Sequence, residues 1–122
     1  MNALMQAKTA YGASATPIRT FRGTEYALFT RVTRKLHAAA RQGRAGFSAL
    51  TEALHENRTM WTTLAADVAD EGNQLPPDLR AQLFYLSEFT AAHTRKVLRG
   101  EANVRPLLEI NMSVMRGLAG KE

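Results

Sequence analysis

The segment from Gly46 to Asp70 carries a helical pattern that constrains the rest of the chain. A stripe that is apolar except for one asparagine recurs at alternating steps of three and four residues: Phe47, Leu50, Leu54, Asn57, Trp61, Leu64 and Val68. This spacing places the stripe on one face of an α-helix with about 3.6 residues per turn. Because an isolated amphipathic helix is only marginally stable in water, the pattern predicts a long helix that other helices cover.

Asn57 and Trp61, both on this stripe, each have two interpretations. An asparagine side chain has about four hydrogen-bonding sites, all of which need partners when it is buried. Asn57 is therefore either a polar core residue that fixes the register between helices or a groove residue that receives the backbone of a partner. Trp61, the only tryptophan in the chain, is either part of the core or a docking residue. Periodicity alone leaves both choices open.

Three further segments have helical patterns. The first begins near Thr24, a suitable N-cap residue, and ends before Gly43, which suits the left-handed position after a helix. The second runs from about Pro77 to Arg99, with a proline in a first turn that needs no amide hydrogen bond. The third covers about Val104 to Leu118 and carries another asparagine, Asn111, on its apolar face.

The residues before Thr24 give a weaker signal. Met1 to Tyr11 has a helical pattern with Leu4 on the same side as Tyr11, and Gly12 to Pro17 indicates a flexible join. We expect the first segment to dock on the body of the protein through Leu4 and Tyr11. The alternative is a loosely held arm.

No strand-type alternation of useful length occurs in the sequence. We therefore predict an all-α fold, a small helical bundle of three long helices plus a short C-terminal helix and an N-terminal helical segment. A chain of 122 residues fits a single domain with a real core. Within residues 1–122 we expect 1–23 to be an N-terminal segment and linker and 24–118 to be the helical core. Short connections make consecutive helices antiparallel neighbours.

The segment from Pro77 to Arg99 is apolar over more of its circumference than one contact requires. Beside its regular stripe it carries an additional aromatic patch, made of Phe84, Tyr85 and Phe89. A helix of this kind is either sandwiched between other helices or presents a docking face.

Composition narrows the range of functions. The chain has no cysteine, which excludes disulfides, thiolate zinc sites and cysteine nucleophiles. Without an apolar run of about 20 residues or an N-terminal signal core, we expect a cytoplasmic protein that has no membrane partner. The net charge of +5 favours acidic partners, and arginine, the commonest basic residue here, suits carboxylates and phosphates equally.

Catalytic patterns are not found in the sequence. His55-Glu56-Asn57-Arg58-Thr59 resembles the H-E-x-x-H zinc signature, but Thr59 stands where the second histidine ligand is required. The three histidines lie on separate predicted segments or faces, and His93, on an apolar stripe, is typical of a core histidine. We predict that the protein is not an enzyme and that it has no metal, no cofactor and no small-molecule substrate.

Short motifs occur in a defined order between Glu25 and Leu118. They are Glu25-Tyr26 with Arg31-Val32-Thr33-Arg34, Asn57-Arg58-x-x-Trp61, Leu64-Ala65-Ala66-Asp67, Asn73-x-Leu75-Pro76, Val97-Leu98-Arg99-Gly100-Glu101 and Glu109-Ile110-Asn111. Together they resemble the FlaF family of bacterial flagellar biosynthesis regulators. The resemblance implies a small cytoplasmic helical protein that is needed for flagellin production and filament assembly. It also implies two partners: flagellin, for which the protein acts as a secretion chaperone, and FlbT, a companion regulator of flagellin translation and messenger stability.

A flagellin chaperone needs a surface that covers the amphipathic terminal helices of flagellin, which polymerise on contact. We expect a helical groove with aromatic and asparagine anchors and arginines at the rim. The candidate partner-binding residues are Asn57, Arg58, Trp61, Phe84, Tyr85, Phe89, Arg95, Arg99 and Asn111.

Two other functions remain open. Direct binding to flagellin messenger RNA is motivated by the basic charge, although the arginines are spread over several predicted helices. A scaffold that binds only FlbT is the third reading. We favour flagellin binding.

Overall fold

The structure is a computed structural model that describes residues 12–120, with side chains described for 26–117. Four α-helices and one short 3-10 helix make up this part of the chain. The elements are α1 (Gly12–Ala40), η1 (Gly43–Gly46), α2 (Phe47–Ala69), α3 (Pro77–Leu98) and α4 (Arg105–Gly120). These described residues contain no strand. The all-α bundle predicted from the sequence is confirmed.

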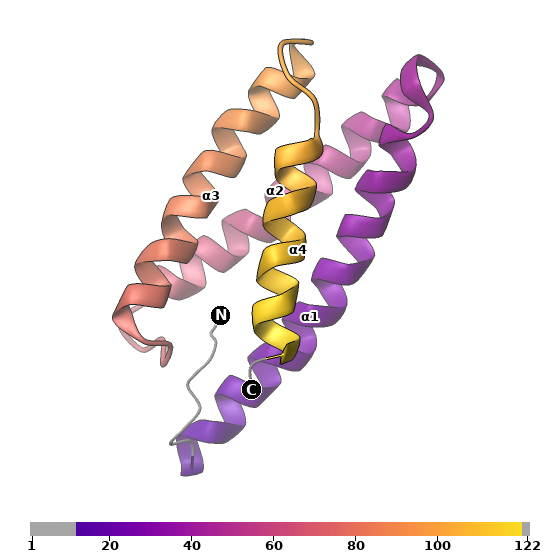
Figure 1. Cartoon of the computed structure of the whole chain (residues 1–122). Helices are drawn as coiled ribbons and strands as arrows, with labels where there is room; N and C mark the ends of the chain where they lie inside the picture. Colours follow the sequence, from indigo (N-terminus) through magenta and orange to yellow (C-terminus); the bar gives the residue numbers. More distant parts are fainter. Residues whose placement is uncertain (1–11, 121–122) are drawn as a thin grey trace.

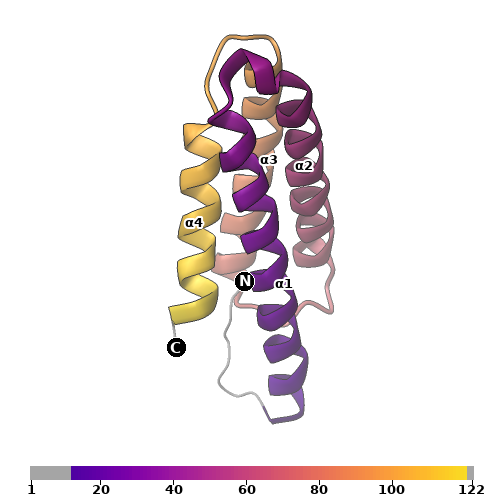
Figure 2. The ribbon, with the colours of Figure 1, turned by 90° about the vertical axis from the view of Figure 1, so that its right-hand side faces the viewer.

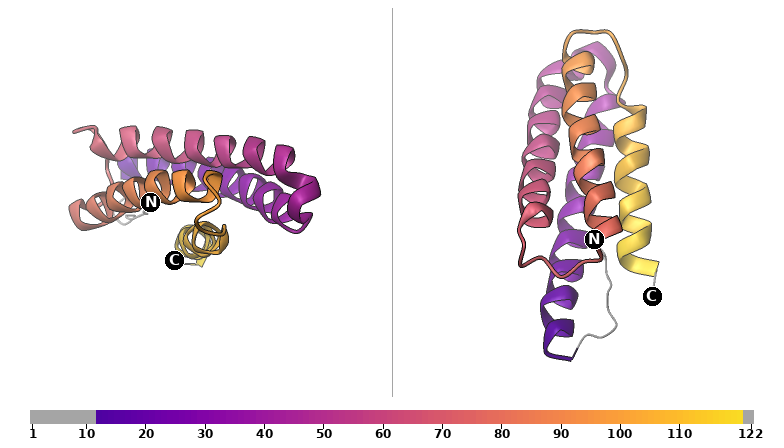
Figure 3. Two further views of the ribbon diagram at one scale, coloured as in Figure 1. Left: turned by 90° about the horizontal axis from the view of Figure 1, so that it is seen from above. Right: turned by 90° about the vertical axis from the view of Figure 1, so that its left-hand side faces the viewer.

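Consecutive helices run in alternating directions (Figure 1). α2 packs against both α1 and α3, whereas α4 packs mainly against α1 and touches α3 at fewer points. Seen from above, α2 and α4 lie on opposite sides of the molecule with α1 and α3 between them (Figure 3). α1 extends beyond the other helices at its N-terminal end (Figure 2).

The helix ends follow local sequence signals. Pro77 stands at the start of α3, where an amide hydrogen is not needed, and Asp78 in the first turn complements the positive end of the helix. Gly43 and Gly100 have positive φ angles of 62° and 77°, which allows the chain to turn after α1 and after α3. The Asn73 side chain accepts a hydrogen bond from the Leu75 amide in the α2–α3 loop.

The start of α1 differs from the prediction. The helix begins at Gly12 rather than near Thr24, so the predicted flexible join from Gly12 to Pro17 is wrong. Alanines favour the helix in this stretch, and Pro17 removes only one main-chain hydrogen bond near the helix start. The expected docking of Met1 to Tyr11 lies outside the described residues.

The core consists of two clusters along the bundle. One surrounds Trp61, whose ring meets Phe29 edge-on with centroids 5.6 Å apart and an interplanar angle of 86°. The second cluster includes Leu36, Leu54 and Leu107 from three different helices. Phe47, predicted to belong to the buried stripe of α2, is 56% exposed because it stands at the very start of the helix.

Candidate protein-docking site

A buried polar cluster occupies the centre of the bundle. Trp61 Nε1 donates a hydrogen bond to Asn111 Oδ1 at 2.9 Å. The amide nitrogen Nδ2 of Asn111 donates to Asn57 Oδ1 at 2.8 Å and to Thr33 Oγ1 at 3.1 Å. The exposed fraction is 0% for both asparagines and 1% for Trp61. One side chain of α4 thus links α1 and α2.

The chemistry of Trp61 fixes how this cluster is oriented. An indole N–H can only donate, so the oxygen of Asn111 must face it and the amide nitrogen must point to Asn57 and Thr33. The amide nitrogen of Asn57 has no partner in the described structure. We therefore correct the prediction for Asn57, Trp61 and Asn111: they are internal packing residues and are not available to a partner on the folded bundle.

The aromatic patch predicted on α3 lies at the surface. The exposed fractions are 44% for Phe84, 66% for Tyr85 and 37% for Phe89. Successive residues of an α-helix are about 100° apart, so Tyr85 lies between Phe84 and Phe89 around the helix. We call these three side chains the α3 aromatic face.

The packing of α3 explains why this face is exposed. Its buried side chains, Leu83, Thr90, Thr94 and Val97, all point to the opposite side of the helix. Polar bonds hold that inner side on α2: Ser87 Oγ donates to the Trp61 carbonyl oxygen at 3.2 Å, and Arg80 Nε donates to the Val68 carbonyl oxygen at 3.0 Å. Within the described residues α3 makes no main-chain approach to α1, and its outer side is exposed.

One edge of the α3 aromatic face is held by a histidine. Phe89 stacks on His93 with ring centroids 5.5 Å apart and an interplanar angle of 19°. His93 Nε2 lies 2.8 Å from the Asn103 carbonyl oxygen, in the loop between α3 and α4. His93 is half-buried with a hydrogen-bond partner and belongs to neither core cluster, so it differs from the core histidine that was predicted. These contacts orient Phe89 before any partner arrives.

Positive charge lies near the C-terminal end of α3. Arg95 and Lys96 are exposed in the last turn. Arg99, just after the helix, donates two hydrogen bonds of 3.1 Å to Glu101, which raises the pKa of Arg99 and lowers the pKa of Glu101. Arg95 and Arg99 were both predicted at the rim. Arg95 lies on the same helix as the α3 aromatic face, whereas Arg99 is already in an ion pair with Glu101.

Arg58, also predicted at the rim, is exposed on α2. It belongs to a different helix from the aromatic residues, and it forms no ion pair with any side chain described between residues 26 and 117. The nine predicted partner-binding residues are therefore not one surface. Three are internal, the aromatic residues and Arg95 lie on α3, and the other two arginines lie outside both groups.

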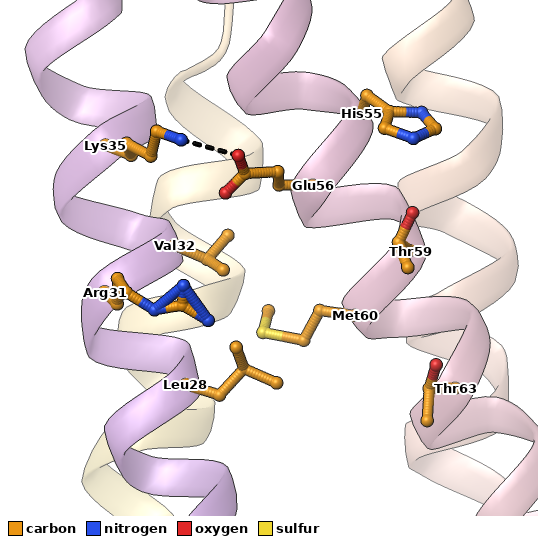
Figure 4. A pocket seen from close by; sticks show the side chains of 9 residues that line it. All are labelled: Leu28, Arg31, Val32, Lys35, His55, Glu56, Thr59, Met60 and Thr63. Atoms are coloured by element: carbon orange, nitrogen blue, oxygen red, sulfur yellow. Dashed lines mark hydrogen bonds and ion pairs between the residues drawn. The ribbon is translucent and has the colours of Figure 1, made fainter.

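A groove between α1 and α2 was not identified from the sequence. Leu28, Val32 and Met60 point into the space between the two helices, and an ion pair between Lys35 and Glu56 closes one end (Figure 4). The hydrogen bond within this pair raises the pKa of Lys35 and lowers the pKa of Glu56. Lys35 and Glu56 lie 21 residues apart on different helices, and spacing along one helix does not reveal a partner on another.

A catalytic arrangement is not evident among the described side chains. Among the side chains described, those of residues 26–117, no three of the metal-binding types gather closely enough to hold a metal ion. His37, His55 and His93 lie on α1, α2 and α3, respectively. None of the described helices combines the length and apolar character needed to cross a membrane.

Comparison with known proteins gives one match. The family model described as flagellar protein FlaF matches residues 7–118, which extends further toward the N-terminus than the motifs starting at Glu25. No curated protein and no solved structure matches the chain. Since the family match covers nearly the whole bundle, the chain belongs to the family of flagellar protein FlaF.

Proposed function

We propose that this protein binds flagellin in the cytoplasm as an export chaperone or adaptor, and that it influences flagellin synthesis together with an FlbT-like regulator. The observation that supports flagellin binding is the exposure of Phe84, Tyr85 and Phe89 on one helix. Large aromatic side chains that gather on a surface are typical of protein docking sites. Membership of the flagellar family provides the context.

The α3 aromatic face suits an amphipathic helix. Tyrosine and phenylalanine offer a large contact area while only two side-chain torsions become fixed on binding. Phe89 is already oriented by His93 and loses less freedom than an isolated side chain would. An apolar stripe of flagellin laid along α3 would be shielded from other flagellin molecules, which is what a chaperone has to achieve.

Charge would assist the encounter. Arg95 and Lys96 lie in the last turn of α3, where they can attract carboxylates on the bound helix. Exposed charges at the edge of an interface mainly raise the association rate, and their effect decreases with salt. We therefore expect Arg95→Glu to slow flagellin binding, most strongly at low ionic strength.

The test is co-elution of the purified full chain with full-length flagellin at micromolar concentration. The combined substitution of Tyr85→Ala and Phe89→Ala should abolish co-elution while the helix content and melting temperature stay close to those of the unmodified protein. Phe47→Ala is the control, because Phe47 is an exposed aromatic residue on a different helix, at the start of α2. It should leave co-elution unchanged.

Two results would contradict flagellin binding through α3. One is co-elution that survives the double substitution. The other is the absence of co-elution by the unmodified chain while binding to an FlbT-like regulator persists, which is the behaviour of a scaffold. Direct messenger binding would instead give a gel-shifted complex that weakens steeply with salt and is insensitive to Tyr85→Ala.

A further inference from the structure

A second groove lies between α1 and α4, away from the α3 aromatic face. Figure 2 shows α1 and α4 side by side with α3 behind them. Its lining includes Tyr26, Arg34 and His37 from α1 and Leu108, Met112 and Met115 from α4. Tyr26 is 40% exposed and Met112 is 46% exposed, so the groove opens to solvent.

The two walls of this groove differ in chemistry. The α4 wall is apolar and rich in methionine, an unbranched side chain that adapts its shape to different partners. The α1 wall carries the guanidinium of Arg34 and the imidazole of His37, and none of the described side chains that line the groove is a carboxylate. Arg34 forms no ion pair with a side chain described between residues 26 and 117. Glu109 and Arg116 are exposed on α4 and are not part of the groove lining.

We infer that this groove binds an amphipathic helix of another protein, one that carries carboxylates along the flank of its apolar stripe. The α1 wall extends from Tyr26 to His37, which at about 1.5 Å per residue gives roughly 16 Å, or about three helical turns. A groove between two antiparallel helices receives the side-chain ridge of a third helix. Leu108, Met112 and Met115 would contact the apolar stripe of the bound helix. Arg34 would pair with the carboxylates of that helix.

Charge decides between this occupant and a second copy of the chain. The protein has a net charge of +5 at pH 7, and pairing through this groove would bring two copies of Arg34 toward each other. Like charges facing each other across an interface are unfavourable, whereas an acidic helix is attracted. This inference does not depend on flagellin binding at α3; it adds a second site, so that the protein can hold two helical segments at once.

The test uses two synthetic helical peptides with the same leucine stripe. One carries glutamates beside the stripe and the other carries lysines at the same positions. The full chain, with ¹³C-labelled methionine methyl groups, is titrated with each peptide, and affinity is measured by fluorescence anisotropy. The glutamate peptide should shift the Met112 and Met115 signals and should bind at least about tenfold more tightly than the lysine peptide.

Variants make the assignment specific. Met112→Asp should weaken binding of the glutamate peptide at least about tenfold, since a carboxylate then stands on the apolar wall and repels the glutamates. Arg34→Glu should reverse the preference between the peptides. Both residues are exposed, so the melting temperature should change little. Phe47→Ala is the control that should bind like the unmodified chain.

Flagellin co-elution separates this site from the first one, because Met112→Asp should leave flagellin co-elution intact. Equal affinity for the two peptides, unshifted Met112 and Met115 signals, or flagellin binding that is lost with Met112→Asp would each overturn the inference. Sedimentation provides a further check. If the full chain self-associates and Met112→Asp abolishes the association, a second copy fills the groove and the inference is wrong.

Discussion

Trp61 on α2 and Asn111 on α4 are joined by a hydrogen bond of 2.9 Å, although the main chains of these two helices do not approach each other within the described residues. The bond crosses the centre of the bundle between helices on opposite sides. Because Asn111 also donates to Thr33 and Asn57, one side chain sets the position of α4 against α1 and α2. A shift of α4 along its axis would leave several buried polar groups unpaired, which makes the register specific.

Asn111→Ala should therefore be strongly destabilising. It leaves the buried Trp61 N–H and the buried Asn57 oxygen without their protein partner, and we expect the free energy of unfolding to fall by about 2–4 kcal/mol. Urea denaturation followed by far-UV circular dichroism measures this. Ser113→Ala, at an exposed position on the same helix, should stay within about 0.5 kcal/mol. Equal losses for both substitutions would contradict the role of Asn111.

The coupling between Trp61 and Asn111 can be measured directly. Trp61→Phe keeps most of the ring volume but removes the indole N–H. In a double-mutant cycle with Asn111→Ala, we expect a coupling energy of about 1–3 kcal/mol, the range for residues in direct contact. Circular dichroism is the suitable probe, because the only tryptophan is lost in one variant. Additive effects would show that the bond contributes little.

Core and surface aromatic residues should respond differently to truncation. Trp61→Ala should lower the free energy of unfolding by about 3–5 kcal/mol, as expected for a fully buried large side chain. Tyr85→Ala should change it by less than about 0.5 kcal/mol, because the side chain is mostly exposed. Thermal unfolding of the two variants side by side provides the measurement. A large loss for Tyr85→Ala would mean that Tyr85 supports the fold, which would weaken its assignment to docking.

The helices could be predicted because each carries its own repeat. The stripe from Leu50 to Val68 and the glycines that follow α1 and α3 are local signals, and they gave the helix positions to within a few residues. The start of α1 could not be predicted in this way, since a Gly-Ala-Ser-Ala-Thr-Pro stretch has turn-forming residues and helix-forming alanines in similar number. Local preference is therefore balanced in this stretch, and the sequence pattern alone does not place the helix start.

The site was only partly predictable for a related reason. Periodicity places Asn57, Trp61 and Phe84 on helix faces, but it does not say which face the next helix covers. Asn57 and Trp61 proved internal because α4 brings Asn111 to them from 50 or more residues away. The exposed aromatic residues of α3 had the clearest sequence signal, an apolar patch in excess of what one packing contact needs. The α1–α4 groove combines residues too far apart in sequence to be associated in advance.

Two glycines should respond in opposite ways to replacement by alanine. A Cβ atom at Gly46 would lie 2.5 Å from Gln42 Cβ and 3.0 Å from the Ala39 carbonyl oxygen, so Gly46→Ala should destabilise the α1–α2 turn by about 1–3 kcal/mol. A Cβ atom at Gly117, inside α4, meets nothing within 4 Å. Gly117→Ala should stabilise the protein by about 0.5–1 kcal/mol, because alanine has less freedom to lose. Calorimetric melting temperatures distinguish the two directions.

Asp67 should make stability depend on pH. Partial burial, and to a smaller extent the nearby charge of Asp70, raise the pKa of the Asp67 carboxyl above its ordinary value of 3.8. The folded state therefore holds this proton more tightly than the unfolded chain, so the contribution of Asp67 to stability grows as the pH falls through the raised pKa. At neutral pH the ionised carboxylate is unfavourable, also because it lies near the negative C-terminal end of α2.

Asp67→Asn should thus stabilise the protein by about 0.5 kcal/mol at pH 7 and should lose this advantage at pH 3. Urea denaturation at the two pH values is the measurement. Asp78→Asn is the matched control, because Asp78 stands in the first turn of α3, where a negative charge is favourable, and its replacement should destabilise at pH 7. The same sign for both substitutions would contradict this explanation.

The one-sided support of α3 has a thermodynamic consequence. Since α2 and, to a lesser degree, α4 hold this helix from within, a polypeptide laid over its outer side would have to leave before the helix could melt. A ligand present at a hundred times its dissociation constant would then add about 2.7 kcal/mol to the free energy of unfolding. In a mixture of candidate proteins, a rise in the melting temperature of this protein would therefore detect a binding partner before the partner is identified.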